Sequence, residues 1–141
     1  MSFEAIFQER NVPIARGEFS VKLESLASHV TAADAGIARR SIDKRFEGDL
    51  EGTSQGEMLS AMGVVQGSAG YVAIERVTGT LHGRSGAFTL QHNATMTRGA
   101  PYLNIIVVPD SGSGALAGLR GTLAITIEGG KHFYAFEYEL D

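Results

Sequence analysis

Hydrophobic and polar side chains alternate with a period of two along most of the chain from Gly17 onward. In the first such segment, Phe19, Val21 and Leu23 are separated by single polar or charged residues. Because successive side chains of a β-strand point to opposite faces, this pattern predicts strands with one buried and one solvated face. No stretch of about ten residues combines helical periodicity with capping residues. The alternation therefore predicts an all-β protein.

A hairpin is predicted around Gly129-Gly130, because this dipeptide favours the two-residue turns whose central residues have positive φ. With the turn fixed, the register of the flanking strands follows residue by residue. The predicted pairs are Glu128 with Lys131, Ile127 with His132, Ile125 with Tyr134, Leu123 with Phe136, Thr122 with Glu137 and Arg120 with Glu139. One face is apolar and the other carries opposite charges, as in a half-buried antiparallel ribbon.

Turn residues divide the rest of the chain into segments of hairpin length. The predicted strands cover about residues 18–24, 37–47, 53–65, 71–82, 87–97, 102–108, 120–128 and 131–139. The 18 glycines lie at the turns and at spaced points inside the strands, as in sheets that bend into barrels. Eight antiparallel strands at this spacing favour a small closed β-barrel, with a sandwich of two sheets as the alternative.

The strands at residues 71–82 and 87–97 bring ionisable residues to an apolar face. A four-residue loop, Gly83–Gly86, would produce the pairs His82–Ala87, Val77–His92 and Glu75–Ala94. Glu75 and His92 would then be diagonal neighbours, within reach of each other's side chains. Tyr71 lies on the same face and is a candidate ligand contact.

Glu75 and His92 allow two interpretations. In the first, they are a catalytic acid and base whose pKa values are shifted by the apolar lumen. In the second, they form a buried ion pair with a structural role, which the sequence favours because ion-pair networks also shift pKa values. Lys44 shares the phase of Ile42 and Phe46, so it is expected to point inward as a third member or as a ligand contact.

The carboxyl-terminal hairpin supplies three further candidate ligand contacts. His132 lies beside the Gly129-Gly130 turn on the apolar phase, which places it at one mouth of the barrel, with Tyr134 and Tyr138 along the wall. The alternative is that His132 is an amphipathic rim residue and that the two tyrosines belong to the core.

Composition limits the class of protein. The chain has 141 residues, a net charge of −4 and no cysteine, which predicts one domain over residues 1–141 without disulfides. Nucleic acid is not expected as a partner, because phosphates require clustered Lys and Arg. The amino terminus, MSFEAIFQER, lacks the basic start and apolar run of a signal peptide, and no segment is long and apolar enough to span a membrane. We therefore expect a cytoplasmic protein with no membrane partner.

No cofactor or metal ion is expected from the sequence. Gly112–Ala117 fits the literal G-x-G-x-x-A dinucleotide pattern, but the strand that begins near Leu119 leaves no room for the helix that binds pyrophosphate. The four histidines are scattered without the spacing of a metal site.

Several ordered segments carry a family resemblance. They are FEGDLEGTSQGEML, GSAGYVAIE, ERVTGTLHGRSGAFTLQH, VVPDSGSGALAGLRGTLAI and GKHFYAFEYEL, and with the residues around them they span most of residues 17–140. In these segments the chain resembles a bacterial family catalogued as domain of unknown function 3224. The resemblance implies the eight-stranded allene-oxide-cyclase-like barrel, which plant cyclases and dirigent proteins share. It implies no reaction, because that family has no established activity.

Three classes of function follow. The first is a protein that binds a small, largely apolar ligand in the barrel lumen. The second is a cofactor-free isomerase or cyclase that uses Glu75 and His92. The third is an oligomeric barrel with a filled lumen that acts through its surface. An outward phase of Tyr102, Ile106 and Val108 would favour a homo-oligomer, most simply a dimer.

Overall fold

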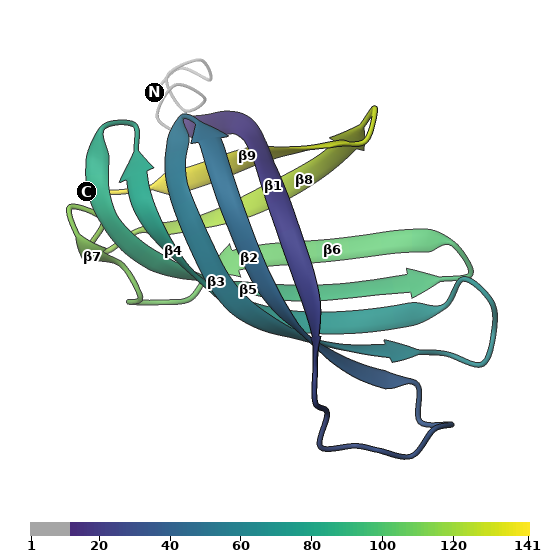
Figure 1. Cartoon of the computed structure of the whole chain (residues 1–141). Helices are drawn as coiled ribbons and strands as arrows, with labels where there is room; N and C mark the ends of the chain where they lie inside the picture. Colours follow the sequence, from purple (N-terminus) through teal and green to yellow (C-terminus); the bar gives the residue numbers. More distant parts are fainter. Residues whose placement is uncertain (1–11) are drawn as a thin grey trace, which may run out of the picture.

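The structure, a computed structural model, describes residues 12–141. This part of the chain is all-β and contains β1 (Ile14–Leu26), β2 (Ile37–Gly48), β3 (Leu50–Met62), β4 (Ala69–Leu81), β5 (Arg84–Thr97), β6 (Ala100–Val107), β7 (Ser113–Gly114), β8 (Arg120–Glu128) and β9 (Lys131–Glu139). Apart from β7, the strands form a closed antiparallel barrel in the order β1-β2-β3-β4-β5-β6-β8-β9, because β9 pairs back with β1 (Figure 1). The predicted barrel is confirmed, and the sandwich is not observed. No membrane-spanning helix is found in the described residues.

The carboxyl-terminal hairpin has the predicted register. Arg120 pairs with Glu139, Leu123 with Phe136 and Glu128 with Lys131. Gly129 and Gly130 have φ values of 57° and 77°, as the predicted turn requires.

The turn between β4 and β5 differs from the prediction. It consists of His82 and Gly83, with Leu81 paired to Arg84, and not of the four residues Gly83–Gly86. Both turn residues have positive φ, 45° for His82 and 82° for Gly83. The prediction was wrong because a non-glycine residue seldom adopts this backbone conformation, so His82 was assigned to the strand.

The corrected turn changes the partners of the two ionisable residues but not the face they occupy. Glu75 pairs with Leu90 instead of Ala94, and His92 pairs with Ala73 instead of Val77. Because the register moves by an even number of residues, every side chain keeps its inward or outward direction. Glu75 and His92 therefore remain diagonal neighbours on the inner face.

One end of the barrel is filled by side chains. Phe88 and Phe136 stack there with ring centroids 5.7 Å apart, and both are fully buried. Leu116 and Leu119, from the connection between β6 and β8, are also buried and join this core. We call this the closed end.

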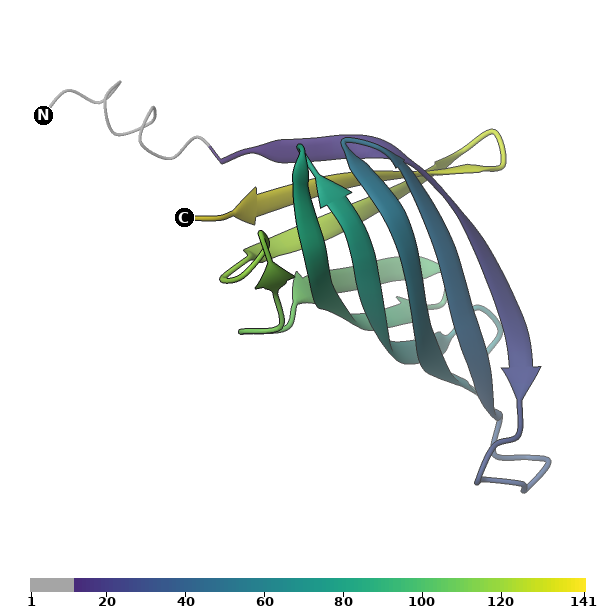
Figure 2. The ribbon, with the colours of Figure 1, turned by 60° about the vertical axis from the view of Figure 1, so that its left-hand side comes forward.

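The strands separate at the opposite end. The last pair between β1 and β9 in the described residues is Phe19 with His132, although β1 continues to Leu26. β6 and β8 pair only at Ile106 and Thr122, and the β8–β9 hairpin diverges from β6 beyond this point (Figures 1 and 2). A cleft of about 440 Å³ lies at this separation. We call this the open end.

Inward-facing apolar side chains at the open end are in contact with solvent. The exposed fractions are 47% for Leu23, 44% for Met96, 40% for Leu103 and 64% for Ile127. Their inward phase follows from the buried residues that alternate with outward positions along the same strands. The open end therefore presents an apolar inner surface that the chain itself leaves uncovered.

Candidate functional site

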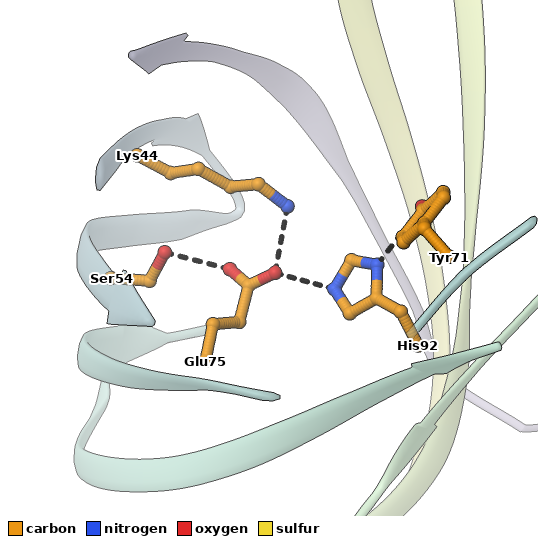
Figure 3. Close-up of polar contacts among 5 residues, drawn as sticks. All are labelled: Lys44, Ser54, Tyr71, Glu75 and His92. Carbon is orange, nitrogen blue, oxygen red and sulfur yellow. Dashed lines mark hydrogen bonds and ion pairs between the residues drawn. The ribbon is translucent and has the colours of Figure 1, made fainter. Parts of the chain in front are cut away.

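A cluster of polar side chains lies on the inner face between the closed and open ends. It is formed by four consecutive strands, β2 to β5, which contribute Lys44, Ser54, Glu75 and His92 (Figure 3). All four side chains are inward-facing and buried in a wall that is otherwise apolar. The period-two alternation of each strand is what directs them to the same surface.

Glu75 is at the centre of this cluster and is fully buried. Its Oε2 accepts a hydrogen bond from Lys44 Nζ at 2.8 Å, and its Oε1 accepts one from Ser54 Oγ at 2.7 Å. His92 Nε2 lies 2.5 Å from the same Oε2, on the side opposite Ser54. No buried side-chain polar atom in the described residues lacks a partner, so the carboxylate is satisfied without a ligand.

A glycine beside Glu75 provides the space for this arrangement. Gly56 pairs with Glu75 on the neighbouring strand. A Cβ atom at Gly56 would lie 2.6 Å from the Cα and 2.8 Å from the Cβ of Glu75, closer than non-bonded atoms allow. A larger residue at position 56 would displace Glu75 and break its contacts with Lys44 and Ser54.

The pKa of Glu75 reflects two opposing effects. Burial disfavours the charged carboxylate and raises the pKa. The hydrogen bond from His92, the positive charge and hydrogen bond of Lys44, and the hydrogen bond from Ser54 outweigh burial and lower the pKa to about 2. Glu75 is therefore an ionised acceptor at neutral pH, which does not suit it to act as a general acid.

His92 connects Glu75 to a residue nearer the open end. Its Nδ1 lies 3.4 Å from the hydroxyl of Tyr71, and the two ring centroids are 6.0 Å apart. Tyr71 is half-buried, and burial, followed by the negative charge of Glu75, raises the pKa of its hydroxyl. The phenol is thus protonated at neutral pH and can donate a hydrogen bond.

The structure gives Glu75 a different role toward a bound molecule from the catalytic role in the sequence-based hypothesis. Glu75 is enclosed by its three partners, so a molecule at the open end meets Tyr71 first and His92 behind it. A carboxylate that accepts from His92 fixes the orientation of the imidazole, as in other carboxylate–histidine pairs. Glu75 is therefore suited to position His92, and Tyr71 is suited to contact a ligand.

His132 lies on the inner wall near this cluster. Its ring centroid is 5.2 Å from that of Phe19, and Lys44 Nζ lies 4.9 Å from the centroid of the same Phe19 ring. The half-buried His132 is thus connected to the cluster through one aromatic ring.

Tyr134 and Tyr138 lie apart from the cluster. The hydroxyl of Tyr134 accepts a hydrogen bond from the backbone N–H of Leu50 at 2.9 Å and lies 2.8 Å from the carbonyl oxygen of Glu47, to which it donates. The hydroxyl of Tyr138 contacts His82 Nδ1 at 2.5 Å. Both rings are buried, so these predicted ligand contacts occupy packing and hydrogen-bonding positions within the wall.

Ser54 was not identified from the sequence as part of the site. It shares the phase of Leu50, the buried residue that begins β3, and the same phase argument that selected Lys44 would have selected it. Small hydroxyl side chains are common on the outer face of strands, which is why the residue type alone gave no signal.

Comparisons with known proteins identify the family. The sequence model of the family described as "Protein of unknown function (DUF3224)" matches residues 15–138. A crystal structure of a protein with unknown function from the DUF3224 family from Shewanella oneidensis MR-1 is similar to this chain, with 50% sequence identity and a TM-score of 0.88. The match covers 93% of this chain and 98% of that chain. The comparison with curated proteins gives no match. The likeness to the allene-oxide-cyclase-like superfamily stays a prediction.

Proposed function

This chain belongs to the DUF3224 family of proteins of unknown function, and we propose that it binds a small, largely apolar ligand at the open end of its barrel. The ligand lies on the inward-facing apolar side chains that the strands leave uncovered. Its polar group lies against Tyr71, at the outer end of the contacts that run through His92 to Glu75.

The observation that carries this proposal is the exposure of apolar residues on the inner face. Leu23 and Leu103 face inward and are 47% and 40% exposed, whereas inward-facing residues at the closed end, such as Phe88, are fully buried. Apolar surface with a few convergent polar groups is what small-molecule sites generally present. The side chains packed at the closed end favour the alternative of an oligomeric barrel without a lumen ligand. At the open end, however, the inner surface is not filled by side chains of the described residues.

A matched pair of leucines tests the proposal. Leu23 faces inward and Leu59 faces outward, yet their exposed fractions are nearly equal, 47% and 49%. The neutral fluorescent probe N-phenyl-1-naphthylamine should bind the wild-type protein, and Leu23→Ser should weaken its binding several-fold. Leu59→Ser should leave the dissociation constant unchanged. Equal effects of the two substitutions, or no binding by the wild-type protein, would overturn the proposal.

The contacts between Glu75, His92 and Tyr71 favour an acid–base enzyme as the second candidate. The hydroxyl of Tyr71 lies between the ligand position and His92 Nδ1, so a proton can pass between a substrate and the imidazole. Native mass spectrometry distinguishes the candidates. Wild-type protein and the His92→Asn variant are both produced in the native host, so that each can retain its natural ligand during purification. A binding protein retains the same compound in both, whereas an enzyme lacking its base retains a different one.

A further inference from the structure

Arg40 places a positive charge on the inner face of the open end. It shares the inward phase of Ile42, Lys44 and Phe46 on β2, and it is partly buried. Its Nη1 donates a hydrogen bond to the hydroxyl of Ser60 at 3.3 Å. Ser60 is an inward-facing residue of β3, so this contact holds the guanidinium on the inner side of the wall.

Arg40 has no counter-charge within the described residues. Along the strands of residues 12–141, Glu75 is the one carboxylate at an inward-facing position, and Lys44 pairs with it at 2.8 Å. The adjacent Arg39, which faces outward, pairs instead with Glu57. The inner face therefore retains the charge of Arg40, although the whole chain carries a net charge of −4.

The position of Arg40 connects it to the candidate site. Its partner Ser60 pairs directly with Tyr71 on β4. Arg40 itself pairs with Met58, which pairs with Ala73, which in turn pairs with His92. The guanidinium and the phenol thus come from β2 and β4, on either side of Ser60 on the intervening strand β3, and share the inner face of the wall.

We propose that the ligand is an amphipathic anion, with a compact anionic group held by Arg40 and Tyr71 and an apolar body on the exposed inner surface. This inference rests on the proposed function and adds the charge of the ligand. An arginine gives planar, charge-assisted hydrogen bonds to a carboxylate, sulfonate or phosphate, and the single O–H of Tyr71 adds one more donor when it turns from His92 Nδ1 to the anion. In an apolar environment such a contact is stronger than the same contact in water.

Two fluorescent probes that share one aromatic body separate this inference from the proposed function. N-phenyl-1-naphthylamine is neutral, and 8-anilinonaphthalene-1-sulfonate carries a sulfonate on the same framework. The wild-type protein should bind the sulfonate more tightly, and Arg40→Gln should weaken the sulfonate about tenfold or more while leaving the neutral probe unchanged. Arg40→Lys should retain part of the preference. Arg39→Gln is the matched control and should alter neither probe, and thermal melts establish that each variant is folded.

The outcomes distinguish the two proposals. If both probes bind the wild-type protein and Arg40→Gln leaves the sulfonate affinity unchanged, the anionic ligand is excluded while the apolar site stands. If neither probe binds, the proposed function fails and this inference fails with it. Sulfonate affinity should also fall with added salt in the wild-type protein and lose that dependence in Arg40→Gln. If the affinity for the sulfonate depended equally on salt in the wild-type protein and in Arg40→Gln, the probe would bind at a surface that does not include Arg40.

Discussion

His92 Nε2 lies 2.5 Å from Glu75 Oε2, although the strand register pairs each of these residues with an apolar partner. The contact is diagonal, and it places one carboxylate between an imidazole and the ammonium group of Lys44. Since all three side chains are buried, each depends on the others to offset the loss of hydration. This relationship makes the cluster sensitive to the removal of any one member.

Replacing Glu75 by Gln should destabilise the protein by about 3–5 kcal/mol, because Lys44 would remain buried without a counter-charge. His92→Leu should also destabilise it, and the Glu75→Gln/His92→Leu double variant should lose less than the sum of the two single losses. The free energies of unfolding are measured by urea denaturation monitored by circular dichroism.

The exposed ion pair of Arg39 and Glu57 supplies the control for this experiment. Glu57→Gln should cost at most about 1 kcal/mol, as surface pairs do. A double-variant loss that equals the sum of the two single losses to within about 0.5 kcal/mol would mean that Glu75 and His92 do not interact.

The low pKa of Glu75 also predicts how stability depends on pH. Its carboxylate has a pKa of about 2 in the folded protein and an ordinary value of 4.5, so its contribution is complete above pH 4.5 and is lost as pH falls through 2. The pKa difference corresponds to about 3 kcal/mol. The stability difference between wild type and Glu75→Gln should therefore shrink by about this amount between pH 5 and pH 2. A constant difference in urea melts across this range would refute the assignment.

The alternating pattern was sufficient to predict the barrel and the inward direction of Lys44, Glu75 and His92. Those predictions depend only on the two-residue period of a strand. An error in register by an even number of residues leaves the direction of every side chain unchanged. The β4–β5 turn was assigned wrongly, yet the contact between Glu75 and His92 was still expected. The Gly129-Gly130 turn was placed correctly because glycine readily adopts positive φ.

The open end could not be predicted from local patterns. It arises because β1 extends beyond its last pair with β9 and because β6 and β8 meet at one position, and both are properties of pairings between distant segments. Arg40 was overlooked for a related reason. Its inward phase could be read from Ile42 and Phe46, but its lack of a carboxylate partner depends on residues from several strands.

Tyr134→Phe should destabilise the protein without affecting ligand binding. The lost hydroxyl would leave the buried N–H of Leu50 without its hydrogen-bond acceptor, at a cost of about 1–3 kcal/mol. Tyr102→Phe, which removes an exposed hydroxyl, is the control and should have almost no effect on unfolding. Urea denaturation and titration with N-phenyl-1-naphthylamine measure the two properties. If Tyr134→Phe instead weakened probe binding and left the free energy of unfolding unchanged, Tyr134 would be a ligand contact.

The outer face of the barrel leads to a prediction about assembly. Ile105 and Val107 are buried in the barrel, so Tyr102 and Ile106 face outward, and Tyr102 is 56% exposed. Val72, on the outer face of β4, is exposed as well. Exposed apolar side chains on the outer face favour self-association, and a two-fold dimer is the simplest closed arrangement.

Sedimentation equilibrium at micromolar concentration should therefore give twice the 15.0 kDa mass of one chain. Ile106→Lys should raise the dimer dissociation constant about tenfold or more, because two-fold symmetry places two new positive charges in one apolar interface. Ser20→Lys adds the same charge at an exposed outward position on β1, distant from β6 in the strand order, and should leave the mass unchanged. A wild-type protein that sediments only at 15.0 kDa would exclude the dimer. A dimer equally weakened by both substitutions would depend on net charge, and the apolar outer surface would then have no part in it.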